Sequence, residues 1–184
     1  MAFIDDPFGH DLIASLQVAL RGKSIELVDR RAYDAARFDA AATMQRVNDL
    51  RPDAFVGLTY LAETMALTAQ LTTLERRPPI NFLAVGTAFP AYAQKFGKRC
   101  DGILGVGSWN RKTSAGARTY FDAHVARFGR EPDRWASGHT YAALQLLQGA
   151  IAKAGLDRRG VREFDYRVPF QMSSNDSTAL IDTP

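Results

Sequence analysis

The sequence of 184 residues has little of what metal-binding and catalytic chains usually carry. It holds one cysteine, Cys100, and three histidines, so an internal disulfide is excluded. The histidines stand on separate segments, and none has a cysteine or carboxylate at metal-ligand spacing. No serine lies in a Gly-x-Ser-x-Gly elbow, and the glycines of 102–107 lack the Lys-Ser/Thr pair of a phosphate loop. The sequence therefore predicts neither an enzyme nor a bound metal or cofactor.

Long apolar runs and clustered charge are also absent. No stretch approaches the roughly 18 apolar residues that a membrane helix needs. The net charge of +3 is small and dispersed, which argues against nucleic acid as a partner. The first residues lack the basic region and apolar core of a signal peptide, so none is predicted there. A hydrophobic fraction of 46% and a charged fraction of 23% are typical of a globular domain.

What the first half does carry is a repeated junction, in which a short apolar run ends in a loop and an amphipathic helix pattern follows. This alternation predicts an α/β fold with a parallel sheet covered on both faces. The predicted strands are 1–4, 24–28, 54–58, 80–85 and 103–106. The predicted helices are 10–21, 38–50, 61–75, 92–96, 117–128 and 138–154.

The pattern changes after Trp109. Residues 110–116 are predicted to be a linker, so the α/β lobe is expected to occupy 1–109. Two helices then follow with no strand between them, within a helical segment expected at 117–168. The second helix carries an apolar stripe, and residues 169–184 are predicted to be a loose tail. The stripe consists of Tyr141, Leu144, Leu147 and Ile151.

In parallel sheets ligands bind at the carboxyl ends of the strands, so the loops there are candidate binding walls. Phe8 and Tyr60 each follow a strand, where packing over the sheet edge and contact with ligand are equally open. Gly86, Thr87 and Ala88 form a loop of small residues whose backbone N–H groups and hydroxyl suit a small molecule. The acids Asp5-Asp6 are expected to cap a helix, and a ligand contact by one of them stays open. These loops hold the predicted ligand-binding residues.

The same residues resemble the type 1 periplasmic solute-binding proteins of the branched-chain amino acid (Leu/Ile/Val) transport family. The strand, aromatic-Gly loop and helix of 2–12 are similar to one stretch of that family. The segments 33–38 and 51–57 resemble the approach to its next strand. The stretches 121–132 and 141–145 are similar to its later helices, and the resemblance covers roughly 2–168.

This resemblance implies a three-layer α/β/α lobe of flavodoxin-like topology, the second of the two lobes that close on a small solute. It implies that the first lobe is missing, and that the helices within 117–154 would pack on it or pair two chains as a homodimer. It further implies a periplasmic component of an ABC importer with a permease as partner. The solute would be a small amino acid, an amide, or an aromatic or aliphatic carboxylate. Phe8 and Tyr60 match aromatic contacts of the family.

The family's amino-acid-binding members usually place a carboxylate near the position that aligns with Lys98. Lys98-Arg99 at that position would repel a ligand's ammonium, which favours a carboxylate or a neutral ligand. Two other functions stay open. One is a ligand-sensing regulatory domain of the same fold. The other is a flavodoxin-like enzyme or response-regulator-like domain, against which Asp5-Asp6 lack the further acid and lysine that phosphoryl chemistry needs.

Overall fold

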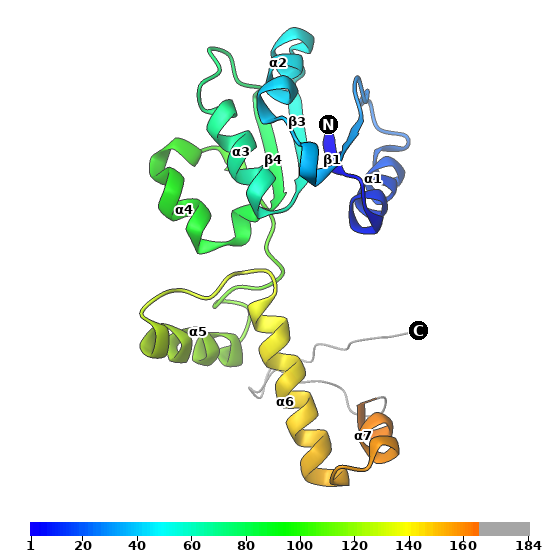
Figure 1. Cartoon of the computed structure of the whole chain (residues 1–184), viewed down its shortest axis with the longest axis vertical. Coiled ribbons are helices and arrows are strands. Elements are labelled where there is room, and N and C mark those ends of the chain that lie inside the picture. Colours follow the sequence, from blue (N-terminus) through cyan, green and yellow to red (C-terminus); the bar gives the residue numbers. More distant parts are fainter. Residues whose placement is uncertain (166–184) are drawn as a thin grey trace. The chain divides into compact units, whose positions relative to one another are not determined.

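A five-stranded parallel sheet frames the first part of the chain in the computed structural model, which describes residues 1–165 (Figure 1). The chain divides into two compact units, the first of Met1–Gly107 and the second beginning at Ser108. The α/β fold with a parallel sheet is confirmed. The predicted tail at 169–184 lies outside the described residues.

The strands of the first unit lie in the order β2-β1-β3-β4-β5, and all neighbours are parallel. This is the flavodoxin-like order, in which the direction of winding reverses between β1 and β3. Such a reversal opens a crevice at the carboxyl ends of the two strands, where ligands bind. The strands are β1 Ala2–Ile4, β2 Arg31–Tyr33, β3 Ala54–Thr59, β4 Ile80–Val85 and β5 Ile103–Leu104.

Helices cover both faces of this sheet (Figure 1). Side chains alternate across a strand, so neighbours in β1 face opposite layers. Ala2 joins the apolar cluster under α2 and α3, whereas the ring of Phe3 meets His10 of α1 edge-on at 5.5 Å. The helices are α1 Pro7–Leu20, α2 Ala40–Leu50, α3 Leu61–Leu71 and α4 Pro90–Phe96. Short 3-10 turns η1 Ala35–Arg37, η2 Gly86–Ala88 and η3 Gly97–Cys100 connect them.

The main core lies between the sheet and the layer of α2 and α3. Leu67, Leu71 and Leu83 are wholly inaccessible to solvent. Burying side chains of this size contributes about 1.5–3 kcal/mol each. The cluster consists of Ala2, Met44, Val47, Phe55, Leu67, Leu71 and Leu83. It holds the central strands rigid and thereby fixes the positions of their carboxyl ends.

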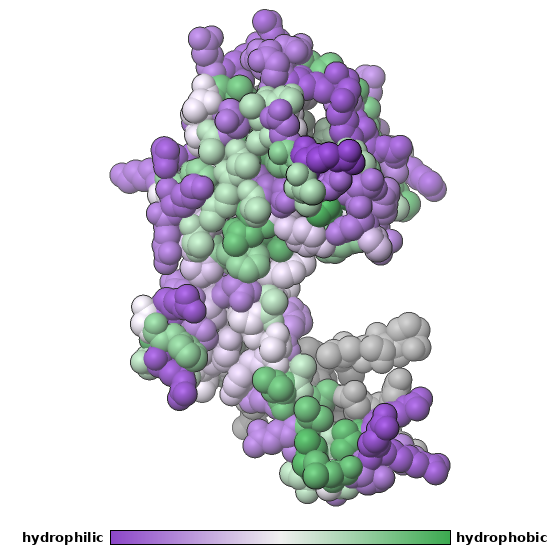
Figure 2. All heavy atoms as spheres, viewed as in Figure 1, coloured by the Kyte–Doolittle hydropathy of each residue, from purple (hydrophilic) through white to green (hydrophobic). Residues whose placement is uncertain are grey.

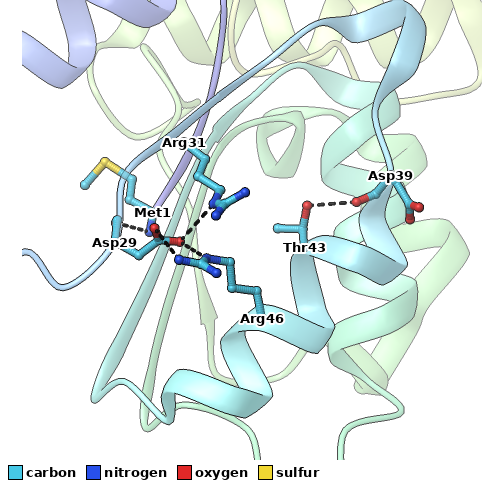
Figure 3. A network of polar contacts seen from close by, with 6 residues as sticks. All are labelled: Met1, Asp29, Arg31, Asp39, Thr43 and Arg46. Atoms are coloured by element: carbon cyan, nitrogen blue, oxygen red, sulfur yellow. Dashed lines mark hydrogen bonds and ion pairs between the residues drawn. The ribbon is translucent and has the colours of Figure 1, made fainter.

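The position of β2 corrects the prediction of a strand at 24–28. Ile25 and Val28 are 61% and 55% exposed, and the strand that pairs with β1 is Arg31–Tyr33. Asp29 helps to fix where the pairing begins: its carboxylate accepts hydrogen bonds of 2.7 and 3.2 Å from Arg46 of α2 (Figure 3). Its carbonyl oxygen accepts one from the Met1 amine at 2.8 Å. The contacts with α2 and β1 therefore outweigh the local apolar alternation of 24–28.

The second unit contains three helices, α5 Ala115–Phe128, α6 Ser137–Ala154 and α7 Arg158–Asp165. The first two lie where helices are predicted, whereas α7 is a helix that the sequence analysis did not identify. α5 begins at a cap in which Ser114 accepts from the Ala117 N–H at 3.0 Å, within the stretch predicted as linker. α7 packs on α6, where the Lys153 ammonium lies 5.6 Å from the centre of the Phe164 ring. None of the helices within 1–165 is long and apolar enough to cross a membrane.

Candidate functional site

The predicted aromatic residues meet at the carboxyl edge of the sheet. Phe8 lies in the first turn of α1, directly after β1, and Tyr60 directly precedes α3, after β3. Their rings stack with centroids 5.5 Å apart and planes inclined by 13°. β1 and β3 are the two strands between which the winding reverses. The structure therefore brings Phe8 and Tyr60 together at the crevice where a sheet of this order binds ligands.

Asp6 connects this aromatic pair to the helix that carries Phe8. One carboxylate oxygen accepts from the Gly9 N–H at 2.8 Å and caps α1, as the sequence predicts. The other accepts from the Tyr60 hydroxyl at 3.0 Å. Desolvation first, and then the bond to Asp6, raise the pKa of Tyr60. The phenol thus stays protonated at neutral pH, and Tyr60 is held while 41% of its surface remains exposed.

The loop after β4 is packed more tightly than predicted. Gly86 and Ala88 are buried, and a Cβ at position 86 would lie 2.5 Å from the Cβ of Thr64 in α3. The Thr87 hydroxyl donates to the Leu83 carbonyl at 2.8 Å, so its proton already has a partner. Thr87 as a ligand-binding residue stays a prediction, and in this structure its hydroxyl donates within the loop. Small residues are needed here because the loop packs against α3.

Two polar residues at the same edge escaped the sequence analysis. Glu63 lies in the first turn of α3, is 8% exposed, and its Oε2 has no hydrogen-bond partner among the described residues. The hydroxyl of Tyr33, at the end of β2, is likewise buried without a partner in 1–165. Burial first, and then the charges of Glu63 and Asp6, raise the pKa of Tyr33, so these groups are electrostatic neighbours. The sequence offered one signal for Glu63, namely an acidic residue in the first helical turn after a predicted strand. Tyr33 was missed because the strand that contains it was predicted at 24–28.

Lys98 does not lie at this edge. Lys98 and Arg99 are in η3, which leads into β5. β5 begins with Ile103 opposite Asn81, the second residue of β4, so η3 lies near the amino-terminal edge of the sheet. The prediction that Lys98 would repel a ligand's ammonium is therefore wrong. The carboxyl edge presents the acids Asp6 and Glu63 instead.

The histidines take local structural roles. His10 pairs with Asp5 at 2.7 Å, and the Nδ1 atoms of His124 and His139 lie 3.0 and 3.1 Å from backbone carbonyl oxygens. Throughout residues 1–165, no three His, Cys, Asp or Glu side chains gather in a way that could hold a metal ion. Cys100 is half-buried, and its thiol donates to the Gly97 carbonyl at 3.0 Å. The aromatic pair and its acidic neighbours remain as the candidate site.

Comparison with known proteins supports the fold. A sequence model described as "Periplasmic binding protein" matches residues 2–177. The solved leucine-binding protein LivK of Thermotoga maritima is similar with a TM-score of 0.70 and 20% identity, over 89% of this chain and 48% of its own. LivJ of Streptococcus pneumoniae is a branched-chain amino acid transporter substrate-binding protein solved with isoleucine. Its TM-score is 0.74 at 20% identity, over 89% of this chain and 47% of its own.

A third solved structure differs in its ligand. It is a solute-binding protein of an ABC transporter from Rhodopseudomonas palustris, in complex with 3,4-dihydroxybenzoic acid. Its TM-score is 0.72 at 19% identity, over 87% of this chain and 45% of its own. The chain thus spans about half the length of these structures, whose likeness establishes a shared fold. No curated protein matches the sequence significantly.

Proposed function

This chain belongs to the periplasmic binding protein family, and from that premise we propose that it binds a small solute at the carboxyl edge of its sheet. The proposed role is that of the solute-binding component of an ABC-type importer, with a permease as partner and the periplasm as location. The solute class is a small amino acid, an amide, or an aromatic or aliphatic carboxylate. The role is one of binding and not of catalysis.

The observation that carries this proposal is the stacked pair of Phe8 and Tyr60 at the carboxyl ends of β1 and β3, the two strands between which the winding reverses. An exposed aromatic surface contributes apolar contact to a ligand at little entropic cost, because its side chains are already held in place. Tyr60 is held by its bond to Asp6, and Phe8 by the capped start of α1. Gly86, Thr87 and Ala88 form the neighbouring wall after β4 and contribute shape and backbone groups.

Binding is proposed to work by closure of a second lobe over this edge. Residues 1–107 supply one parallel-sheet wall, so the 184-residue chain makes about half of the contacts of a closed site. A Kd of about 1 mM corresponds to only about 4 kcal/mol, which a half-site of this kind can supply. We therefore expect weak binding by this chain.

The test is titration of the chain with isoleucine and with 3,4-dihydroxybenzoate, followed by NMR chemical shifts of the amides in residues 1–107. We expect a Kd in about the millimolar range that Phe8→Ala or Tyr60→Ala weakens about tenfold. Phe128→Ala is the matched control, because Phe128 is an exposed aromatic residue of the second unit. A sub-micromolar Kd would contradict the proposal that this chain makes only about half of the contacts to the solute. A Kd that neither Phe8→Ala nor Tyr60→Ala changes would contradict the proposed location of the site.

A second copy of the chain is proposed as partner for the helices within 117–154. The apolar stripe of α6 is exposed, and Figure 2 shows hydrophobic side chains gathered over this helix. Such a surface favours association, because covering it removes apolar area from water. The stripe contains Tyr141, Leu144, Leu147 and Ile151, exposed by 40, 59, 46 and 36%. Light scattering after size exclusion measures the mass, and a monomer at all concentrations would exclude the dimer.

A further inference from the structure

A hollow of about 280 Å³ lies at the amino-terminal edge of the sheet, opposite the candidate solute site. One wall is formed by the end of α2 and the start of β3, and the other by the segment 75–79 that precedes β4. Small-molecule sites typically occupy about 300–1,000 Å³, so this hollow is close to the lower end of that range. Its charged residues are all exposed, so a ligand can reach them from solvent. They are Arg51, Asp53, Glu75, Arg76 and Arg77.

Hydrogen bonds hold the two walls of this hollow in place. The Ile80 N–H donates to the Asp53 carbonyl at 3.1 Å and thereby joins one wall to the other. The side-chain amide of Asn81, which is buried, donates to the Pro78 carbonyl at 2.7 Å and fixes the second wall. The hollow is therefore formed before a ligand arrives, which lowers the entropic cost of binding.

The three arginines of the hollow hold most of their N–H groups unused. Arg77 donates one hydrogen bond of 3.2 Å to the Thr72 carbonyl at the end of α3, where a cation offsets the negative end of the helix. The side chains of Arg51 and Arg76 form no ion pair or hydrogen bond with any residue of 1–165. A guanidinium carries five N–H donors, so the hollow offers a large set of donors to an anion.

Arg51 stands in a backbone conformation that favours glycine. Its φ and ψ are 49° and 52°, and it is the one residue other than glycine with a positive φ in the described part of the chain. The position directly follows α2, where glycine is the most common residue. The helix end by itself therefore gives no reason for a long charged side chain here. Residues held in such conformations cluster at functional sites, which indicates a binding role for the guanidinium.

We propose that this hollow binds a phosphate ester of a hydroxylated alcohol, at a site separate from the solute site. The planar fork of arginine donates paired hydrogen bonds to phosphate oxygens. One arginine satisfies both oxygens of a carboxylate, whereas a phosphate has acceptors for several guanidinium groups. Asp53 and Glu75 repel a bare anion, but their oxygens accept hydrogen bonds from the hydroxyl groups of the alcohol. A free ester and a lipid headgroup share this chemistry.

The first experiment titrates the full 184-residue chain with glycerol 3-phosphate, inorganic phosphate, propionate and glycerol at low salt. NMR chemical shifts locate the site, and the amides within 47–53 and 75–77 should move. We expect glycerol 3-phosphate to bind about tenfold more tightly than propionate and about threefold more tightly than inorganic phosphate. Glycerol should not bind measurably. Added salt should weaken the binding, because ions screen exposed charges.

The variants assign the binding to the arginines. Arg51→Gly removes a guanidinium and introduces the residue that the left-handed conformation favours, so the variant should fold. It should weaken the binding of glycerol 3-phosphate about tenfold, and Arg76→Gln should weaken it similarly. Arg30→Gln is the matched control, because Arg30 is an exposed arginine that precedes β2 and does not line the hollow. Its Kd should change less than about twofold.

Vesicles separate the two sources of the ester. The chain is sedimented with vesicles of phosphatidylcholine alone and with vesicles that also contain phosphatidylglycerol, whose headgroup is a phosphate ester of glycerol. Sedimentation that requires phosphatidylglycerol and is lost in Arg51→Gly identifies a lipid headgroup as the ligand. Binding of glycerol 3-phosphate without sedimentation identifies a free ester.

The remaining outcomes overturn the proposal. Shifts confined to the loops after β1 and β3 would assign the anion to the proposed solute site and exclude the hollow. A folded Arg51→Gly variant with the parent Kd would exclude the arginine as a ligand contact. Equally tight binding of inorganic phosphate or propionate would exclude a phosphate ester as the preferred class. Absence of both binding and sedimentation would exclude the site altogether, and the solute-binding proposal would be unaffected.

Discussion

The close approach of α1 to the end of β1 leads to a sharp prediction about Gly9. A Cβ at this position would overlap the carbonyl oxygen of Ile4 and lie 2.9 Å from its carbonyl carbon. Backbone atoms cannot rotate away, so in Gly9→Ala the start of α1 must move off the strand. Such overpacking costs about 1–3 kcal/mol. Displacement also strains the 2.8 Å cap between the Gly9 N–H and Asp6, which contributes about 1 kcal/mol.

One effect works in the opposite direction. Alanine is favoured over glycine in a helix by about 0.5–1 kcal/mol. We therefore expect Gly9→Ala to lower the free energy of unfolding of the first unit by about 2–3 kcal/mol. Phe8 adjoins Gly9, so solute binding should weaken together with stability. The matched control is Gly149→Ala in α6, where a Cβ would meet Phe164 at an ordinary 3.7 Å. That change should stabilise the second unit by about 0.5–1 kcal/mol.

Urea unfolding followed by circular dichroism measures both variants, and hydrogen exchange of the α1 amides locates the effect of Gly9→Ala. Both tryptophans, Trp109 and Trp135, lie in the second unit, so their fluorescence reports on that unit alone. A Gly9→Ala variant as stable as the parent chain would refute the packing of α1 against β1. An equal loss in Gly149→Ala would show that glycine itself, and not the clash, is responsible.

Three further predictions concern buried and charged contacts. Tyr92→Phe removes the 3.0 Å bond between the Tyr92 and Thr68 hydroxyls and should cost about 1–2 kcal/mol in urea unfolding. Burial raises the pKa of Tyr92, so as pH rises the phenol ionises in the unfolded chain before it does in the folded one. The free energy of unfolding should therefore be unchanged up to about pH 10 and fall above it. The fall should be less steep in Tyr92→Phe. Arg46→Ala should lower stability slightly at pH 7, where its bond holds the pKa of Asp29 below the ordinary value. That contribution should be lost as pH falls through the lowered pKa, so parent and variant converge in acid. Leu147→Glu should turn any dimer into monomers in light scattering, whereas a dimer that survives it would exclude the α6 stripe as interface.

How much of the fold is readable from the sequence depends on how local each signal is. The strands β3 and β4 and the helices α5 and α6 lie where predicted, because their signals are local in the sequence. The two strands are short apolar runs, and α5 begins at the adjacent Ser114 cap. β2 was misplaced because Ile25 and Val28 show a good strand pattern that no neighbouring strand uses. Strand pairing is a long-range choice, and the bonds of Asp29 to Arg46 and Met1 are part of what decides it.

For the candidate site, the sequence by itself determined which loops form it. Phe8 and Tyr60 follow apolar runs, and parallel strands must end at one edge, so the two aromatic residues had to be near neighbours. Only the tertiary structure decided the rest. It stacked the two rings, joined Tyr60 to Asp6, and left Glu63 and Tyr33 buried without partners among the described residues. It also placed Lys98 at the opposite edge. The physical reason is that the burial and charge pairing of a side chain depend on residues that are distant in the sequence. The order of strand, loop and helix depends mainly on residues that are close in the sequence.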